Sequence, residues 1–275
     1  MALVVNTNMP SLTIENLLNT TNNNLNNDLT QLSSGLRINS AQDDPAGYAI
    51  ANSFKAAVSS MNVASQNANQ AQSMLQTADG AYSQINNIMV QMKSLATEAA
   101  SGQESSTNLA SLNNEFQDLA SEINQIANST VYGGTTLLGS NVVTVTFQVG
   151  DTANINDQFV VALSGATTTF LNIAGLDLNN MADAQTAMTS LDNALTSINA
   201  IMGNVGGMQN QLQYAVSNLT TTIQNYTSSA STIEDVDMAS AVSDMTKQQI
   251  LEQSAMAMLA QANQDPQQIL KLLQG

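Results

Sequence analysis

The apolar residues of this chain recur every three or four positions over very long stretches. The longest such run extends from Met188 to Tyr226 without a proline, and one polar residue, Gln209, stands within it. A sustained alternation of threes and fours keeps one apolar seam along a helix, as in coiled coils and long bundles. Because a globular helix averages about 11–12 residues, we predict much longer helices here. The run consists of Met188, Leu191, Leu195, Ile198, Met202, Val205, Gln209, Leu212, Val216, Leu219, Ile223 and Tyr226.

Two further runs with the same spacing precede this one, on either side of a break at Ser101-Gly102. Each predicts another helix with one buried face. The first run comprises Leu75, Ala78, Tyr82, Ile85, Met89, Met92, Ala96 and Ala99, and the second comprises Leu109, Leu112, Phe116, Leu119, Ile123 and Ile126.

Between the second and third runs the apolar period changes to two. This alternation of β-branched residues with polar ones predicts a small β element of two or three strands. An isolated hairpin is only marginally stable in water, so we expect it to pack on the helices. The residues expected to face the helices are Val143, Val145, Phe147 and Val149, with a second strand at Phe159, Val161 and Leu163. Those expected to face solvent are Thr144, Thr146, Gln148, Ser164, Thr167, Thr168 and Thr169.

Both ends of the chain carry weaker helical seams among many Asn and Thr residues, which are poor helix formers. Such helices need a partner in order to fold, either each other or other copies of the chain. The fold class predicted is therefore mainly α, with a long antiparallel helical rod or coiled coil formed by the N- and C-terminal halves and a small hairpin inserted between them. The seam residues expected to pack between subunits are Leu18, Leu25, Leu32, Leu36, Leu251, Ala255, Met258, Leu259 and Ala262.

The composition excludes several classes of function. Five Lys and Arg against 21 Asp and Glu give a net charge of −16, and His and Cys are absent. These absences exclude Cys/His zinc sites, Ser-His-Asp triads, thiol nucleophiles and disulfides. Nucleic-acid and anionic-membrane binding require basic residues that are scarce here. No apolar run reaches the length of a membrane span, and residues 1–12 lack the pattern of a secretory signal peptide.

Two acidic clusters are the strongest candidates for chemistry. Asp43 and Asp44 adjoin Pro45 in a turn, where paired carboxylates could hold a cation or act as acid and base. Capping preferences favour a helix N-terminus instead, and the acidic segment 234–237 has the same interpretation. We therefore predict no catalytic, cofactor or metal site.

The two ends of the chain resemble bacterial flagellins. The N-terminal motif is LSSGLRINSAQDDPAG at residues 32–47, followed by Ala49-Ile50-Ala51. The C-terminal motifs lie at residues 233–237, 249–253 and 259–264. The resemblance implies that residues 1–40 and 235–275 form an inner coiled-coil domain. It also implies a rod domain from 41–180 and 181–234, with a hairpin at 141–178 and no outer domains.

The resemblance further implies a structural subunit that polymerises into a filament for swimming and is exported through the flagellar type III apparatus. Its implied partners are further copies of itself, the cap and hook–filament junction proteins, and an export chaperone at the C-terminal region. The Toll-like receptor for flagellin is implied through Gln91, Leu95 and Glu115, although the family commonly has Arg where this chain has Gln91. Chemistry and expected exposure alone suggest O-linked glycans on Ser164, Thr167, Thr168 and Thr169. The alternatives are a hook–filament junction protein and a flagellin-like stalk carrying an adhesive or enzymatic surface.

Overall fold

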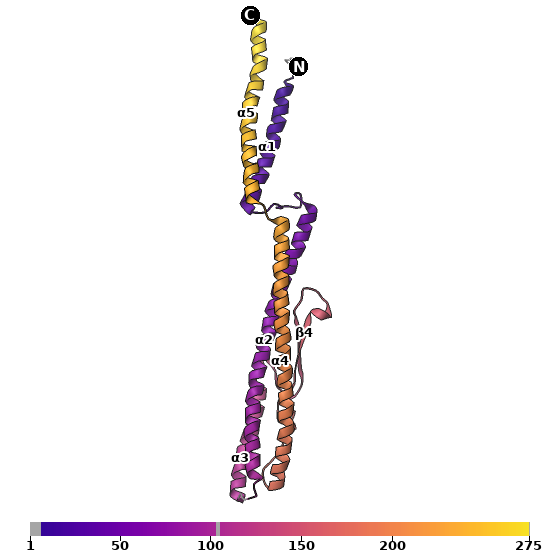
Figure 1. The fold of residues 1–275 in the computed structure, drawn as a ribbon, viewed down its shortest axis with the longest axis vertical. Coiled ribbons are helices and arrows are strands. Elements are labelled where there is room, and N and C mark those ends of the chain that lie inside the picture. The colour runs from indigo at the N-terminus through magenta and orange to yellow at the C-terminus, as the bar shows by residue number, and fades with distance from the viewer. Residues whose placement is uncertain (1–6, 103–104, 275) are drawn as a thin grey trace. The chain divides into compact units, whose positions relative to one another are not determined.

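The computed structural model describes residues 7–102 and 105–274, with the side chains described as far as residue 264. The chain divides into two compact units, Met1–Ala56 with Asn225–Gly275, and Ala57–Gln224. We call them the terminal unit and the central unit. Figure 1 shows the elements along the chain. The helices of the described part are α1 (Met9–Ser34), α2 (Pro45–Ala99), α3 (Ser106–Ser129), α4 (Met181–Glu234) and α5 (Met238–Gln274).

The core of the central unit is built from the three apolar runs. All eight residues of the run from Leu75 to Ala99 lie in α2 and are at most 2% exposed. In α3, Phe116 and Ile123 are fully buried. The run in α4 alternates between buried positions such as Leu191 and half-buried positions that pack against the same cluster. The prediction of long helices with one buried seam is confirmed.

A small hairpin packs on these helices. Strand β3 (Val143–Gln148) pairs antiparallel with β4 (Gln158–Leu163), with Phe147 opposite Phe159. Val145, Phe147 and Val149 pack against the helical core, and Thr144 and Thr146 are exposed. The predicted inward face is therefore confirmed for Val145, Phe147 and Val149, and Val143 is half-buried outside that cluster. A second, two-residue pairing of β1 (Val131–Tyr132) with β2 (Thr135–Thr136) precedes it.

Gln148 does not face solvent as expected. It is half-buried, and its side-chain amide donates hydrogen bonds to the carbonyls of Gly150 and Thr152, at 3.2 and 2.7 Å. Its backbone carbonyl accepts a hydrogen bond from Asn67 of α2 at 3.0 Å. The strand is therefore fastened to α2 by its polar end as well as by its apolar face.

The expectation that Thr167 and Thr168 face solvent is wrong. They are 5% and 6% exposed. The side chain of Asn124 in α3 accepts a hydrogen bond from the backbone N–H of Thr168 at 3.0 Å and lies 2.9 Å from its hydroxyl. A buried threonine needs such partners because an unpaired polar group away from water is costly. Of the predicted loop, Thr169 is exposed and Ser164 is half-buried.

The terminal unit pairs the two ends of the chain. In Figure 1, α1 and α5 run side by side. The Asn8 side chain at the start of α1 donates a hydrogen bond to the carbonyl of Ala262, late in α5, at 2.8 Å. At the other end of the pair, Leu36 forms an antiparallel bridge with Asp235. The two helices are therefore antiparallel, as the fold class predicted.

Candidate functional site

The contact between α1 and α5 is a seam with a three-four spacing. Of the residues predicted to pack between subunits, Leu18, Leu25, Leu32, Ala255, Leu259 and Ala262 lie in this contact within the subunit, with the two alanines buried and the leucines half-buried. Leu36, also half-buried, follows the end of α1. Leu251 and Met258 do not lie in the contact, because they are 38% and 59% exposed. Leu251 directly precedes Glu252, whose half-buried side chain follows the spacing of the seam instead. The seam comprises Ser11, Ile14, Leu18, Thr21, Leu25, Asp28 and Leu32 of α1, and Ala241, Met245, Gln248, Glu252, Ala255, Leu259 and Ala262 of α5.

Polar residues interrupt this seam on both helices. Thr21 is almost completely buried, and one carboxylate oxygen of Asp28 is shielded from solvent with no hydrogen-bond donor. Burial, reinforced by the nearby charge of Asp244, raises the pKa of Asp28. Each buried polar group without a partner lowers the net gain from packing the two helices. The pair is therefore weaker than an apolar coiled coil of the same length.

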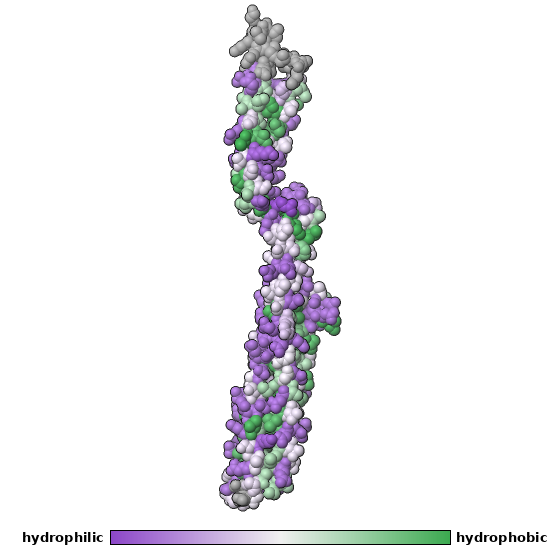
Figure 2. All heavy atoms as spheres, viewed as in Figure 1, coloured by the Kyte–Doolittle hydropathy of each residue, from purple (hydrophilic) through white to green (hydrophobic). Residues whose placement is uncertain are grey.

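The outer surfaces of the same two helices expose several large apolar side chains. Figure 2 shows green, hydrophobic side chains among the purple ones along the described part of this pair. Within the part of the chain that the structure describes, no helix combines the length and hydropathy of a membrane span. Exposed apolar patches of this kind mark contact sites for other proteins. The exposed residues are Met9, Leu12, Leu17 and Leu29 of α1, and Met238, Val242, Ile250, Leu251, Met256 and Met258 of α5.

Asp44 caps a helix, and its neighbour Asp43 closes the preceding turn. Asp44 accepts hydrogen bonds from the N–H groups of Ala46 and Gly47 at 3.1 and 2.9 Å, at the start of α2. Asp43 accepts from the backbone N–H groups of residues 39 and 40 and from the Ser40 hydroxyl, and these bonds lower its pKa. The interpretation as a helix N-cap is confirmed for Asp44, whereas Asp43 closes the turn that precedes α2 and caps no helix.

In the segment 234–237, Asp237 caps a helix and Glu234 forms an ion pair. Asp237 accepts a hydrogen bond from the N–H of Ala239 at 2.9 Å and caps α5. Glu234 instead ends α4, is 3% exposed and forms an ion pair with Lys55. Its expected place in a solvated N-terminal turn is therefore wrong. The partner of Glu234 lies far away in sequence, so local spacing gave no signal for this ion pair.

The residues expected to contact the receptor all belong to the central unit. Gln91 on α2 and Glu115 on α3 are exposed, whereas Leu95 is half-buried and packs against the helical core. The three remain a predicted contact set.

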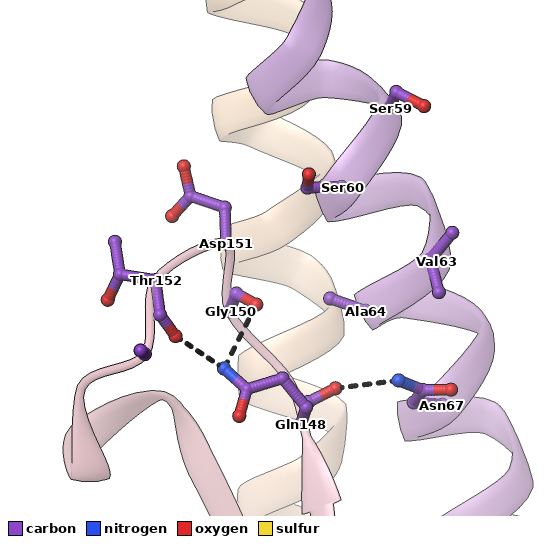
Figure 3. A pocket seen from close by; sticks show the side chains of 10 residues that line it. Ser59, Ser60, Val63, Ala64, Asn67, Gln148, Gly150, Asp151 and Thr152 are labelled. Carbon is purple, nitrogen blue, oxygen red and sulfur yellow. Dashed lines mark hydrogen bonds between the residues drawn. The ribbon is translucent and has the colours of Figure 1, made fainter.

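A shallow groove lies beside the turn that follows β3. Its volume is about 530 Å³, and its walls come from α2 and from the connection between β3 and β4 (Figure 3). The polar groups that line it are hydroxyls, amides and the single carboxylate of Asp151. In the described ranges no three acidic side chains gather as a metal cluster would require. The groove offers no nucleophile with an adjacent base.

Sequence analysis missed a row of amide side chains on α3 that holds the segment after β4. Asn113 accepts a hydrogen bond from the N–H of Leu178 at 2.8 Å, and Gln117 donates one to the carbonyl of Leu176 at 2.7 Å. With Asn124, these residues recur at intervals of four and seven on one helix face. That spacing among polar residues, beside the apolar seam, was the available signal.

The fold and its exposed terminal helices define a helical structural protein suited to association with other chains. Comparison with known proteins agrees. Residues 5–142 match the model of the bacterial flagellin N-terminal helical region, and residues 188–273 match that of the C-terminal helical region. The chain belongs to the bacterial flagellin family.

Individual relatives match over almost the full chain. The flagellin of Halalkalibacterium halodurans is 34% identical over 273 residues, covering 98% of this chain and 100% of the relative. The flagellar filament 33 kDa core protein of Treponema phagedenis is 32% identical over 287 residues, with 98% and 100% covered. A putative flagellar hook-associated protein from Vibrio parahaemolyticus shares the fold, with a TM-score of 0.58 at 13% identity and 70% and 99% covered.

Proposed function

We propose that this chain polymerises into a bacterial flagellar filament, and that its terminal helices complete their packing only among neighbouring subunits. The observation that carries this proposal is the apolar outer surface of α1 and α5, combined with a seam interrupted by Thr21 and Asp28. Isolated helices gain little stability without tertiary packing. Association buries the exposed apolar side chains and thereby couples folding to polymerisation.

The test measures assembly directly. Purified chain is seeded with sheared filaments, and the critical concentration is determined by sedimentation and electron microscopy. Ile250→Gln removes an exposed apolar side chain of α5, and burial of such a side chain contributes about 1.5–3 kcal/mol. We expect the critical concentration to rise about tenfold or more. Gln253→Ala, at an exposed amide one turn along the same helix, is the matched control for the loss of a polar side chain and leaves it within about twofold. Wild-type chain that forms no filaments contradicts the proposal.

The remaining roles follow from family membership. We propose export through the flagellar type III apparatus with a chaperone on the C-terminal region, and an extracellular filament in contact with the cap and hook–filament junction proteins. This assembly role requires no catalysis. A junction protein would occur in few copies per filament, so the number of chains per unit length of sheared filament separates the two roles. Contact with the Toll-like receptor through Gln91, Leu95 and Glu115 remains a separate proposal.

A further inference from the structure

Exposed methionines are concentrated on the terminal helices of this chain. The chain contains 14 methionines, and methionine usually fills irregular gaps in a protein core. Some do so here, since Met89 and Met92 on α2 are fully buried. Among the methionines that the structure describes, five are at least 47% exposed, and four of these lie on α1 or α5. They are Met9, Met238, Met256 and Met258, and the fifth is Met181 at the start of α4.

Three of these methionines lie at the same end of the helix pair. Met9 is the first residue of α1 and follows Asn8, whose side chain donates a hydrogen bond to the carbonyl of Ala262 at 2.8 Å. Met256 and Met258 precede Ala262 on α5 by between one and two helical turns. The start of α1 therefore lies beside the part of α5 that carries the other two methionines. We call the side chains of Met9, Met256 and Met258 the terminal thioethers.

A thioether is a nucleophile toward peroxides. Its sulfur attacks one oxygen of hydrogen peroxide, the O–O bond breaks, and the proton on the transferred oxygen moves to the departing hydroxide. The products are a sulfoxide and one water, and the sulfur loses the electron pair that the peroxide gains. The chain has no cysteine, whose thiolate would compete for the oxidant. Hydrogen peroxide is uncharged, so a net charge of −16 does not repel it from the surface.

Oxidation changes the polarity of a surface that is otherwise apolar. Met258 and Leu251 are seven positions apart on α5, so they share one helix face, and both are exposed. A sulfoxide is polar and carries an acceptor oxygen. Covering it without a donor is unfavourable, whereas covering a thioether is favourable. The same side chain therefore favours association in one oxidation state and opposes it in the other.

We propose that the terminal thioethers are an oxidation site at which hydrogen peroxide reversibly prevents polymerisation of the free subunit. The free subunit exposes these sulfur atoms, and assembly covers them and protects them from the oxidant. Methionine sulfoxide reductases, one for each sulfoxide epimer, regenerate the thioether and with it the capacity to assemble. This inference rests on the proposed polymerisation and specifies how the surface responsible for it is regulated.

Peroxide treatment of the free chain tests the site. Peptide mapping locates the sulfoxides, and the critical concentration of each chain in seeded assembly is compared with that of its own untreated sample. We expect that of wild type to rise at least about tenfold, because polar groups replace apolar ones on the covered surface. Treatment with both reductases should return it to within about twofold of the untreated value.

Substitution by leucine identifies the sulfur atoms responsible. Leucine is apolar, has a similar volume and does not form a sulfoxide. In a chain that carries Met9→Leu, Met256→Leu and Met258→Leu, peroxide should change the critical concentration by less than about twofold. If peroxide raises it as much as in wild type, the terminal thioethers are not the site.

The matched control removes the other exposed methionines instead. Met181 and Met238 are 48% and 49% exposed, and neither belongs to the terminal thioethers. A chain with Met181→Leu and Met238→Leu should remain as sensitive to peroxide as wild type, with a rise of at least about tenfold. A control chain that has become resistant overturns the proposal.

Finished filaments provide an independent measurement. We expect the terminal thioethers to oxidise at least about tenfold more slowly in filaments than in the free chain, because association covers them. Equal rates overturn the proposal. The oxidised free chain should keep its cooperative thermal transition, since Met89 and Met92 are buried. Loss of that transition assigns the effect to unfolding and also overturns the proposal.

The wild type separates this inference from the proposed function. If untreated and oxidised wild type assemble equally well, the oxidation site is excluded while the proposed function stands. If untreated wild type does not assemble, the proposed function itself fails.

Discussion

Single polar residues determine how strongly the two terminal helices pair. Thr21 and Asp28 occupy seam positions that apolar side chains hold in a tightly packed coiled coil. A half-buried carboxylate without a donor opposes the packing that its apolar neighbours Leu25 and Leu32 favour. These residues therefore keep the pair dependent on outside contacts.

The pairing of α1 and α5 should strengthen as pH falls. Because the pKa of Asp28 is raised in the folded state, by burial first and by Asp244 second, protonation favours the paired form. This contribution is present at low pH and is lost as pH rises through the raised pKa. Lys247 is the cation among the described side chains of α5, three positions from Asp244. We expect far-UV circular dichroism to show more helix at pH 4.5 than at pH 7, with a smaller difference in Asp28→Asn.

A second carboxylate, that of Asp43, sets the lowest pH at which that experiment can be carried out. Backbone donors lower the pKa of Asp43, so its stabilising contribution is lost only as pH falls below the ordinary carboxyl value of about 3.9. Measurements above pH 4.5 therefore leave out the contribution of Asp43. Asp118→Asn, at an exposed position on α3, should keep the wild-type slope. An Asp28→Asn variant with that same slope contradicts the account.

Receptor recognition provides another residue-scale prediction. Gln91 is exposed on α2, at a position where the resemblance to flagellins implies an Arg. A guanidinium can make a bidentate, charge-assisted contact that an amide cannot. Losing such a contact at the centre of an interface costs roughly 2–4 kcal/mol. We expect the monomer to stimulate receptor-bearing reporter cells more weakly than a flagellin with Arg at this position does. Gln91→Arg should restore part of the response. An unchanged response to that substitution rules out the proposed role of this position.

At the scale of elements, α3 serves as the anchor for the segment after β4. Its amide side chains provide hydrogen bonds to backbone groups that belong to no strand or helix. Since a buried backbone N–H must find a partner, these amides help the connection to lie against the helices. The high Asn and Gln content thus has a structural use in the central unit.

Removal of one of these amides should destabilise the central unit. Asn124→Ala leaves the N–H and hydroxyl of buried Thr168 without their partners, and such a loss costs about 1–3 kcal/mol. We expect the urea midpoint to fall accordingly, with an unchanged m-value. Gln117→Ala removes a bond from an exposed amide and should cost less than about 1 kcal/mol. Equal losses in the two variants argue against burial as the cause.

Local periodicity predicted the elements of this fold but not its long-range polar contacts. The seam from Leu75 to Ala99 and the alternation in β3 each depend on neighbouring residues, so the sequence contains the full pattern. The burial of Thr168 depends on Asn124, which is 44 positions away. The pairing of Glu234 with Lys55 likewise joins residues that are 179 positions apart. No local pattern indicates such partners.

At the scale of the whole molecule, the two units differ in how completely they bury their apolar residues. The central unit encloses a continuous core that includes α2, α3, α4 and the hairpin. The terminal unit leaves many apolar side chains of α1 and α5 exposed. A net charge of −16 makes identical chains repel each other. Subunit contacts must therefore rely on apolar burial and on the few available cations.

Removing residues 250–275 should separate folding from assembly. The deletion takes away Ala255, Leu259 and Ala262, which face α1 in the seam, and several exposed apolar residues of α5. The central unit lies wholly within Ala57–Gln224, so its core is untouched. We expect the shortened chain to keep a cooperative thermal transition but to lose helical signal from α1, which no longer has a packing partner over its first half.

Seeded assembly followed by sedimentation and electron microscopy should then show no filaments at concentrations where the full chain polymerises completely. Filaments formed by the shortened chain would show that polymerisation does not depend on the terminal pair. Loss of the cooperative transition would show that the two units do not fold independently.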